Sequence, residues 1–239
     1  TQQSNPSNPT QRKLSPSIAS TSTKTKRKIR CDISDALLKL SHPNTGFLPN
    51  LTMWSPRRQK GPTKIVGPAY TVQYVPLDDP APKYEGHYID TVPEGAVIFV
   101  SSPRSTSNAV YGGLMSTRAK ARGAVGVVVD GRFRDLGEQR GLGFPVFARD
   151  VGTAPPYGSV KVSAVDVPVT VQDEAAGKEL VVSPGDYIVA DLNGVVCLPR
   201  ELAEKVLPLM ERQVAADEKI SADIKEGVSF VEASRKHRG

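Results

Sequence analysis

Residues 111–135 have the sequence YGGLMSTRAKARGAVGVVVDGRFRD, and this stretch decides which fold the chain is expected to adopt. A glycine pair comes first, and a predicted helix of about three turns follows it and ends at Gly123. The apolar run 126–129 then indicates a buried strand, and the polar residues after it, which end with Arg134 and Asp135, indicate a loop. The stretch therefore predicts a loop, helix, strand and loop unit, which is typical of α/β proteins.

Both ends of this unit carry residues that suit an anionic ligand. Gly112 and Gly113 open the predicted helix, and the first N–H groups of a helix have no partner within it, so they can bind a carboxylate or a phosphate. Arg134 can form a fork with a carboxylate, and the Asp135 carboxylate is a ligand that Mg²⁺ accepts. A simpler interpretation stays open, in which the glycines form only a turn and Arg134 and Asp135 form a solvated ion pair.

The rest of the ordered chain has the pattern of a mixed α/β domain. Leucines at helical spacing predict a helix over residues 32–40 with Ser34 as its N-cap, and Asp32 and Asp35 are interpreted as capping acids. Residues 43–62 are turn-rich. Further segments are predicted as strands at 65–75, 96–101, 160–171, 180–182, 187–190 and 195–198, as a short helix at 135–143, and as a long helix at 200–227.

Composition indicates one domain preceded by a basic tail. The chain has 239 residues, of which 38% are hydrophobic and 23% charged, which is enough apolar material for one sizeable core. Residues 1–28 are rich in Ser, Thr, Asn, Gln and Pro, so they are predicted to be disordered, and residues 29–239 to form the domain. Seven of the 31 Lys and Arg residues lie in the first 31 residues, where no acid occurs, so the remainder carries 24 basic and 25 acidic residues. The basic tail alone therefore favours nucleic-acid binding, and the chain lacks interleaved aromatic residues, so that function is not expected.

Several stretches together resemble one known family. They are residues 111–135, GPAYTV at 67–72, FPVFA at 144–148 and PGDYIVAD at 184–191. They are similar to the family that contains the regulator of ribonuclease E activity A (RraA) and the class II 4-hydroxy-4-methyl-2-oxoglutarate aldolases, over about residues 31–227. In that family an Asp is followed after twenty residues by Arg-Asp. Here Arg134 and Asp135 match this pattern, and Gly113 occupies the position of the first Asp.

The resemblance implies a fold and an assembly. The fold is a three-layer β/β/α sandwich of the swivelling type, and the assembly is a homotrimer or a dimer of trimers with sites at subunit clefts. An acid near the end of the long helix, Asp217 or Glu218, would reach the metal of a neighbouring subunit through water. A solvated helix face is the alternative for these two acids.

The resemblance also implies roles for residues of the central unit. Asp135 would ligate a divalent metal, Mg²⁺ or Mn²⁺, and Arg134 would hold the carboxylate or carbonyl oxygen of a substrate. The backbone amides of Gly113, Leu114 and Met115 would bind the substrate carboxylate. Because Gly113 has no acidic side chain, proton transfer at this site needs another group.

We therefore expect a metal-dependent lyase that acts on small 2-oxo acids. Two reactions fit, which are cleavage of 4-hydroxy-4-methyl-2-oxoglutarate to pyruvate, for which a base is needed, and decarboxylation of oxaloacetate, for which none is needed. The alternative is a non-catalytic RraA-like protein that binds and regulates a ribonuclease or another partner. No apolar run is long enough for a membrane span, so the cytoplasm is expected, and the acid-free, Ser-rich tail leaves a mitochondrial location open.

Overall fold

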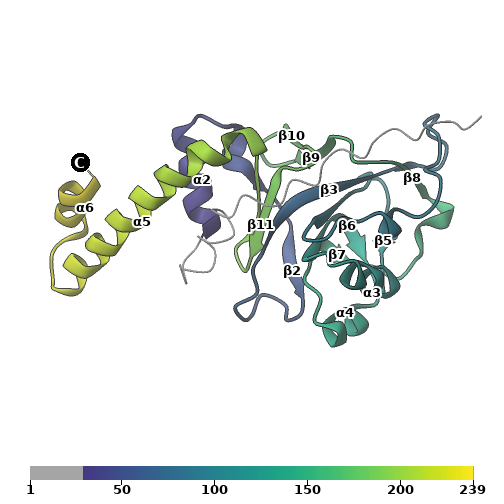
Figure 1. Ribbon diagram of the computed structural model, residues 1–239, viewed down its shortest axis with the longest axis horizontal. Coiled ribbons are helices and arrows are strands. Elements are labelled where there is room, and N and C mark those ends of the chain that lie inside the picture. Colours follow the sequence, from purple (N-terminus) through teal and green to yellow (C-terminus); the bar gives the residue numbers. More distant parts are fainter. Residues whose placement is uncertain (1–28, 239) are drawn as a thin grey trace, which may run out of the picture.

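The computed structural model of the 239-residue chain describes residues 29–238. The predicted tail, residues 1–28, lies outside the described residues. The described part forms a mixed α/β domain with a helical arm that projects from one side (Figure 1). No helix among the described residues is both long enough and apolar enough to cross a membrane.

A ten-stranded mixed sheet forms the centre of the domain. Its main strand order is β1-β12-β11-β3-β4-β6-β7-β2, with β5 beside β6 and β8 beside β3. The pairs β3–β4, β4–β6, β5–β6 and β6–β7 are parallel, and the other pairs are antiparallel. The strands are β1 (Phe47–Leu48), β2 (Thr52–Ser55), β3 (Ile65–Pro76), β4 (Val97–Ser101), β5 (Ala109–Tyr111), β6 (Gly126–Phe133), β7 (Val146–Val151), β8 (Val160–Val165), β11 (Tyr187–Asp191) and β12 (Gly194–Leu198).

The central parallel strands are buried on both faces, which explains why they are apolar at every position. On β4, Ile98 and Val100 contact one core, whereas Val97 and Phe99 contact the other, because successive side chains of a strand point to opposite faces. The first core lies under α3 (Gly113–Ala121) and α4 (Leu136–Leu142). The second lies against the separate hairpin of β9 (Val169–Asp173) and β10 (Lys178–Val182) and against β11 and β12.

These layers confirm the predicted three-layer β/β/α sandwich. The helical layer is α3 and α4, the middle layer is the parallel part of the sheet, and the third layer is the β9–β10 hairpin with the antiparallel end of the sheet. A further cover, α2 (Ile29–Lys39) and the start of α5 (Ala203–Lys225), packs on the outer side of β11 and β12.

Several predicted element boundaries were wrong. The first helix begins at Ile29 rather than near Ser34, so Ser34 lies inside α2 and is not its N-cap. The strand predicted at 126–129 continues to Phe133, because it pairs with both β5 and β7 along its polar end. The turn-rich segment 43–62 contains β1 and β2, which are short edge strands held by pairing with distant strands.

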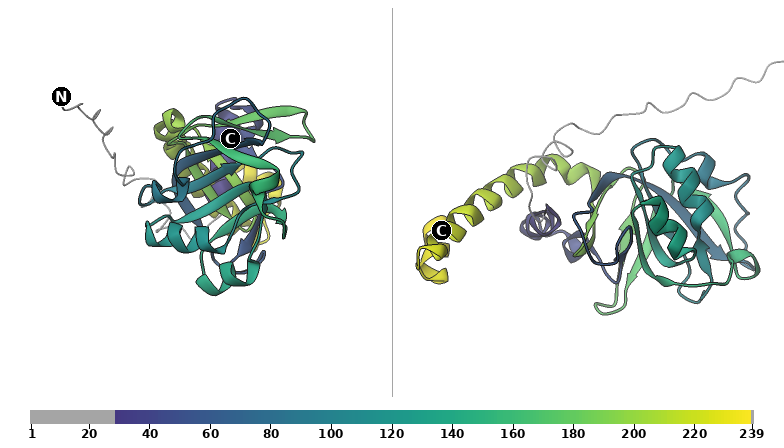
Figure 2. Two further views of the ribbon diagram at one scale, coloured as in Figure 1. Left: turned by 90° about the vertical axis from the view of Figure 1, so that its right-hand side faces the viewer. Right: turned by 90° about the horizontal axis from the view of Figure 1, so that it is seen from below.

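A helical arm completes the chain. Helix α5 includes Pro208 without ending there, and α6 (Phe230–Arg238) folds back beside it. Asp223 on α5 holds this turn, because it pairs with Lys236 at 3.1 Å and with His237 at 2.8 Å. Figure 2 shows the arm extending from the side of the domain opposite α3.

Candidate active site

Two segments that follow parallel strands lie side by side at one edge of the sheet. Strand β5 pairs with β6 so that Tyr111 lies opposite Phe133. The pairing continues one step further, because the Arg134 N–H donates to the Tyr111 carbonyl at 2.9 Å. The glycine pair after β5 and the Arg134-Asp135 pair after β6 therefore meet, and loops at the carboxyl ends of parallel strands are where α/β proteins bind ligands.

The Asp135 carboxylate bonds to the start of α3. Its Oδ2 accepts a hydrogen bond from the Gly113 N–H at 2.9 Å and lies 3.7 Å from Arg134 Nε. The positive end of the helix dipole favours an anion at this position. A Cβ on Gly112 would lie 2.8 Å from Asp135 Oδ2, so a glycine there is what allows the carboxylate to approach the helix.

The helix start offers fewer open amides than the sequence predicts. The Gly113 N–H is occupied by Asp135, and the Met115 N–H donates to the Gly112 carbonyl at 3.1 Å. The Leu114 N–H lies in the first turn, where helix geometry supplies no partner. Binding of a substrate carboxylate by all three amides stays a prediction that requires Asp135 to release Gly113.

A small cavity of about 150 Å³ lies beside the helix start. Its walls include Arg134 and Asp135 and also residues from loops distant in the sequence, His87 and Tyr157 among them. The hydroxyl of Tyr88, a buried residue of the cavity wall, has no hydrogen-bond partner among the described residues. Buried polar atoms normally have partners, so an unpaired hydroxyl in a cavity wall suits a polar ligand.

Three tyrosines of this cavity remain protonated near neutral pH. Burial raises the pKa of Tyr74 to about 12 and raises the pKa of Tyr88 and Tyr111 above the ordinary value. Their hydroxyls can therefore donate hydrogen bonds to a ligand but cannot serve as bases. Sequence reasoning did not identify these residues, because no motif links Tyr74 and Tyr88 to the glycine pair.

Glu138 lies closer to the site than the sequence could specify. The sequence left Glu138 and Arg140 open to face either the site or solvent. A Cβ on Gly113 would overlap Glu138 Oε2 and would lie 3.3 Å from Asp135 Cβ, so the Glu138 carboxylate occupies the space beside Gly113. Arg140 is exposed and donates its Nε–H to the Trp54 carbonyl at 3.3 Å.

The donors at this site fit a hydrated hard cation better than a caged one. Within residues 29–238, no group of three or more His, Cys, Asp or Glu side chains is arranged to hold a metal ion. Mg²⁺ usually keeps several waters and needs only one or two carboxylates together with its substrate. Asp135, whose side chain is 35% exposed, and the neighbouring Glu138 meet that requirement.

Asp217 and Glu218 lie far from this site within one chain. Both are on α5, which projects from the opposite side of the domain (Figures 1 and 2). Asp217 accepts from Gln213 Nε2 at 3.1 Å and pairs with Arg238. Either acid could contribute to the site only from a second copy of the chain, and that contribution stays a prediction.

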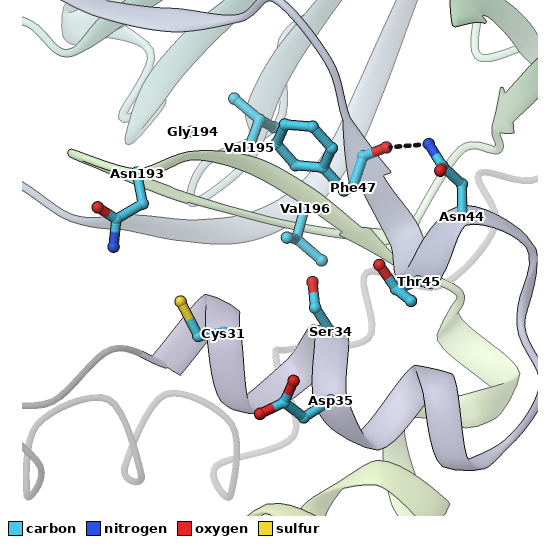
Figure 3. Close-up of a pocket in the computed structure, with 10 residues that line it drawn as sticks. All are labelled: Cys31, Ser34, Asp35, Asn44, Thr45, Phe47, Asn193, Gly194, Val195 and Val196. Atoms are coloured by element: carbon cyan, nitrogen blue, oxygen red, sulfur yellow. Dashed lines mark hydrogen bonds between the residues drawn. The ribbon is translucent and has the colours of Figure 1, made fainter. Parts of the chain in front are cut away.

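A second pocket, separate from this site, lies between α2 and β12 (Figure 3). Asp35, interpreted from the sequence as a capping acid, lies in its wall with Cys31 and Ser34. Helix α2 is on the side of the domain that carries the arm, so Asp35 does not contribute to the site at α3 (Figures 1 and 2).

Comparison with known proteins gives a consistent family. A sequence model for the family described as RraA-like, Aldolase/RraA, matches residues 30–197. The "Putative 4-hydroxy-4-methyl-2-oxoglutarate aldolase" of Halalkalibacterium halodurans is 31% identical over 173 residues, which cover 71% of this chain and 76% of that protein. Protein DlpA of Legionella pneumophila is 28% identical over 172 residues, and the match spans only 27% of its length.

Solved structures agree with the sequence comparisons. An uncharacterized protein from Pseudomonas syringae matches with a TM-score of 0.71 and 30% identity, over 85% of this chain and 90% of that one. Streptomyces coelicolor RraAS2, described as an unusual member of the RNase ES inhibitor RraA family, matches with a TM-score of 0.69 and 26% identity. That match covers 92% of this chain and all of the Streptomyces chain, so the fold extends through nearly the whole described domain.

Proposed function

The chain belongs to the RraA-like family, Aldolase/RraA, and from its site we propose that it is a metal-dependent lyase for small 2-oxo acids. The two reactions are cleavage of 4-hydroxy-4-methyl-2-oxoglutarate to two pyruvates and decarboxylation of oxaloacetate. The first reaction is the one that the names of several relatives carry, including the Halalkalibacterium protein and one from Thermus thermophilus.

One observation carries the proposal, which is the meeting of Arg134 and Asp135 with the glycine start of α3. Arg134 supplies a cation with a planar fork, and the helix start supplies amide donors and a favourable dipole for an anion. Both substrates are dicarboxylates, so these donors match them. The cavity is small, which suits a compact acid rather than a large ligand.

The chain's own residues bind and orient the substrate. Arg134 holds a carboxylate or the 2-oxo oxygen of the substrate, and the Leu114 N–H donates to the carboxylate. The hydroxyl of Tyr88 is a further donor, because it lacks a protein partner among the described residues. These donors face the oxygen atoms on which negative charge grows as the carbon–carbon bond breaks, which is where fixed donors lower a barrier most.

Asp135, with Glu138 beside it, would hold Mg²⁺ or Mn²⁺. The cation would supply Lewis-acid stabilisation of the negative charge that the 2-oxo group gains. In this proposal the assembly is a trimer or a dimer of trimers, in which Asp217 or Glu218 of a second copy approaches the site.

The test is a pyruvate-release assay on the full chain with each substrate, in Mg²⁺ and in EDTA. We expect release above the spontaneous rate with at least one substrate, and loss of that release in EDTA. Release that equals the protein-free control in both conditions would contradict the proposal.

One observation favours a second candidate, a non-catalytic regulatory protein. Gly113 carries no acid, and the Streptomyces neighbour is described as a member of an RNase inhibitor family. That candidate predicts inhibition of a ribonuclease by protein that releases no pyruvate. The lyase is preferred because Arg134 and Asp135 are both present and adjoin a cavity.

A further inference from the structure

We propose that Glu138 is the general base that removes the C4 hydroxyl proton during aldol cleavage, and that Gly113 is glycine so that this carboxylate can occupy its place. The inference rests on the proposed lyase function, because it assigns a step of that reaction. It concerns only aldol cleavage, since decarboxylation of oxaloacetate releases no hydroxyl proton.

The placement of Glu138 follows from three backbone features. Asp135 adopts the left-handed conformation, with φ 63° and ψ 40°, and α4 begins directly after it. Glu138 is three residues further on, and residues three apart on a helix share one face, so both carboxylates point toward the start of α3. Gly113 has no side chain between them, and a Cβ there would overlap Glu138 Oε2.

Glu138 is also free to accept a proton. Among residues 29–238 no hydrogen bond or ion pair of its side chain is found, and the residue is exposed. Asp135 differs, because its Oδ2 already accepts the Gly113 N–H and lies near Arg134, and both contacts favour the ionised, non-basic carboxylate.

The other groups around the cavity are donors. Tyr74, Tyr88 and Tyr111 are protonated because burial raises the pKa of each one. His87 accepts the Ile89 N–H at its Nδ1 at 3.3 Å, so in the neutral ring the proton is on Nε2. Glu138 is thus the carboxylate beside the site that no other contact commits.

The proton step balances without a further reagent. Glu138 takes the C4 hydroxyl proton, the C4–O bond becomes a carbonyl, and the C3–C4 bond breaks. The electron pair of that bond forms the enolate of pyruvate. The proton held by Glu138 then passes to C3, which gives the second pyruvate and restores the carboxylate.

The experiment exchanges the acid between positions 138 and 113. The variants are Glu138→Gln, Gly113→Asp and the double variant Gly113→Asp/Glu138→Gln, and Glu211→Gln on the exposed surface of α5 is the matched control. Gly113 does not have a positive φ, so its backbone accepts a side chain. Both reactions are measured for each variant, together with calorimetric oxalate affinity in Mg²⁺, which reports an intact site without turnover.

The result that we expect is a selective loss with rescue. Glu138→Gln lowers aldol cleavage by about 100-fold, in the range for loss of a general base, while oxaloacetate decarboxylation and oxalate affinity change by less than about threefold. The double variant regains at least about tenfold of the lost aldol cleavage, because the aspartate introduced in place of Gly113 brings a carboxylate to the same space. Glu211→Gln matches the parent in all three measurements.

Two contrary results have different meanings. Parent protein that cleaves the aldol substrate, with a Glu138→Gln variant that cleaves it equally well, would overturn the base role and leave the lyase proposal standing. Equal losses of both reactions and of oxalate affinity would also overturn it, since Glu138 would then hold the metal or the site's structure. Parent protein inactive on both substrates would overturn the proposed function and, with it, the base role.

Discussion

Two Arg and Asp groups lie at the same edge of the sheet, and β6 contributes to both. Asp130, within β6, has a side chain only 2% exposed, and it pairs with Arg149 and, at 3.5 Å, with Arg104. Asp135, just beyond β6, is 35% exposed and lies 3.7 Å from Arg134. The same residue types are therefore enclosed and paired in one place and open in the other.

This difference separates a structural ion pair from a candidate binding group. Asp130 has its charge balanced inside the protein, so a ligand would have to displace an arginine to reach it. Asp135 has one backbone donor and a long ion pair, so its remaining oxygen capacity is available to a ligand. The residues that resemble the family's site are the less committed ones.

The largest expected effect is on stability, from Arg149→Gln. This change leaves buried Asp130 with only Arg104, and loss of one partner of a buried pair costs about 3 kcal/mol in the free energy of unfolding. Arg132→Gln is the control from the same cavity, since its pair with Asp150 is exposed and 3.8 Å long and contributes less than about 1 kcal/mol. Urea unfolding measures both, and equal values would contradict the contrast.

That stability loss should depend on pH. Burial raises the pKa of Asp130, and Arg149 and Arg104 oppose the rise, so removal of Arg149 raises the folded-state pKa further. A carboxyl group with a raised folded pKa destabilises the fold when it is ionised, and the cost disappears as pH falls below that pKa. The gap between parent and Arg149→Gln should therefore be smaller at pH 5 than at pH 7, and a gap that widens on acidification would contradict this account.

The next effect is on activity, from Asp135→Asn. The change removes the charge that would hold Mg²⁺, so oxaloacetate decarboxylation should fall by about 100-fold or more and recover in part at high Mg²⁺. Stability should change by less than about 1 kcal/mol, because the group is at the surface. Asp78→Asn, in an exposed loop, is the control. Activity and metal dependence equal to those of Asp78→Asn would identify Asp135 as a surface ion pair only.

Arg134→Lys should have a smaller effect, confined to substrate binding. The ammonium keeps the charge and loses the planar fork, so KM should rise by about tenfold, which is about 1.4 kcal/mol, with the Mg²⁺ requirement unchanged. Steady-state kinetics at several Mg²⁺ concentrations measure both quantities. A shifted Mg²⁺ requirement with unchanged KM would mean that Arg134 acts on the metal site instead.

The smallest effect should come from deletion of residues 1–28. The composition of this segment offers almost no apolar side chains to a core, so melting temperature and activity should stay near those of the full chain. Thermal unfolding of both forms measures it. A substantial fall in melting temperature would show that the segment packs on the domain.

The sequence predicted the helix, strand and loop unit because its signals are local. The glycine pair, the apolar run of β6 and the hairpin at Asp191 and Gly194 each depend on neighbouring residues, and all three are observed. The start of α2 and the short strands β1 and β2 depend on packing with distant segments, so local patterns missed them.

The candidate site was predictable only along the central stretch. Arg134 and Asp135 follow a strand and could be expected to meet the glycine start of the next helix. The cavity wall comes from Tyr74, His87, Tyr88 and Tyr157, which reach the site through strand pairing and loop paths that no motif specifies. The direction of Glu138 depends on the left-handed backbone of Asp135, which the sequence does not reveal.

The central claim is that the open Arg134 and Asp135 group at the start of α3 is a metal-dependent site for 2-oxo acids. Calorimetric titration of the full chain with oxalate, in Mg²⁺ and in EDTA, tests it most directly. We predict binding in Mg²⁺ only, and loss of that binding in Asp135→Asn but not in Asp78→Asn. Equal oxalate affinity in Mg²⁺ and EDTA, or undiminished affinity in Asp135→Asn, would contradict the claim.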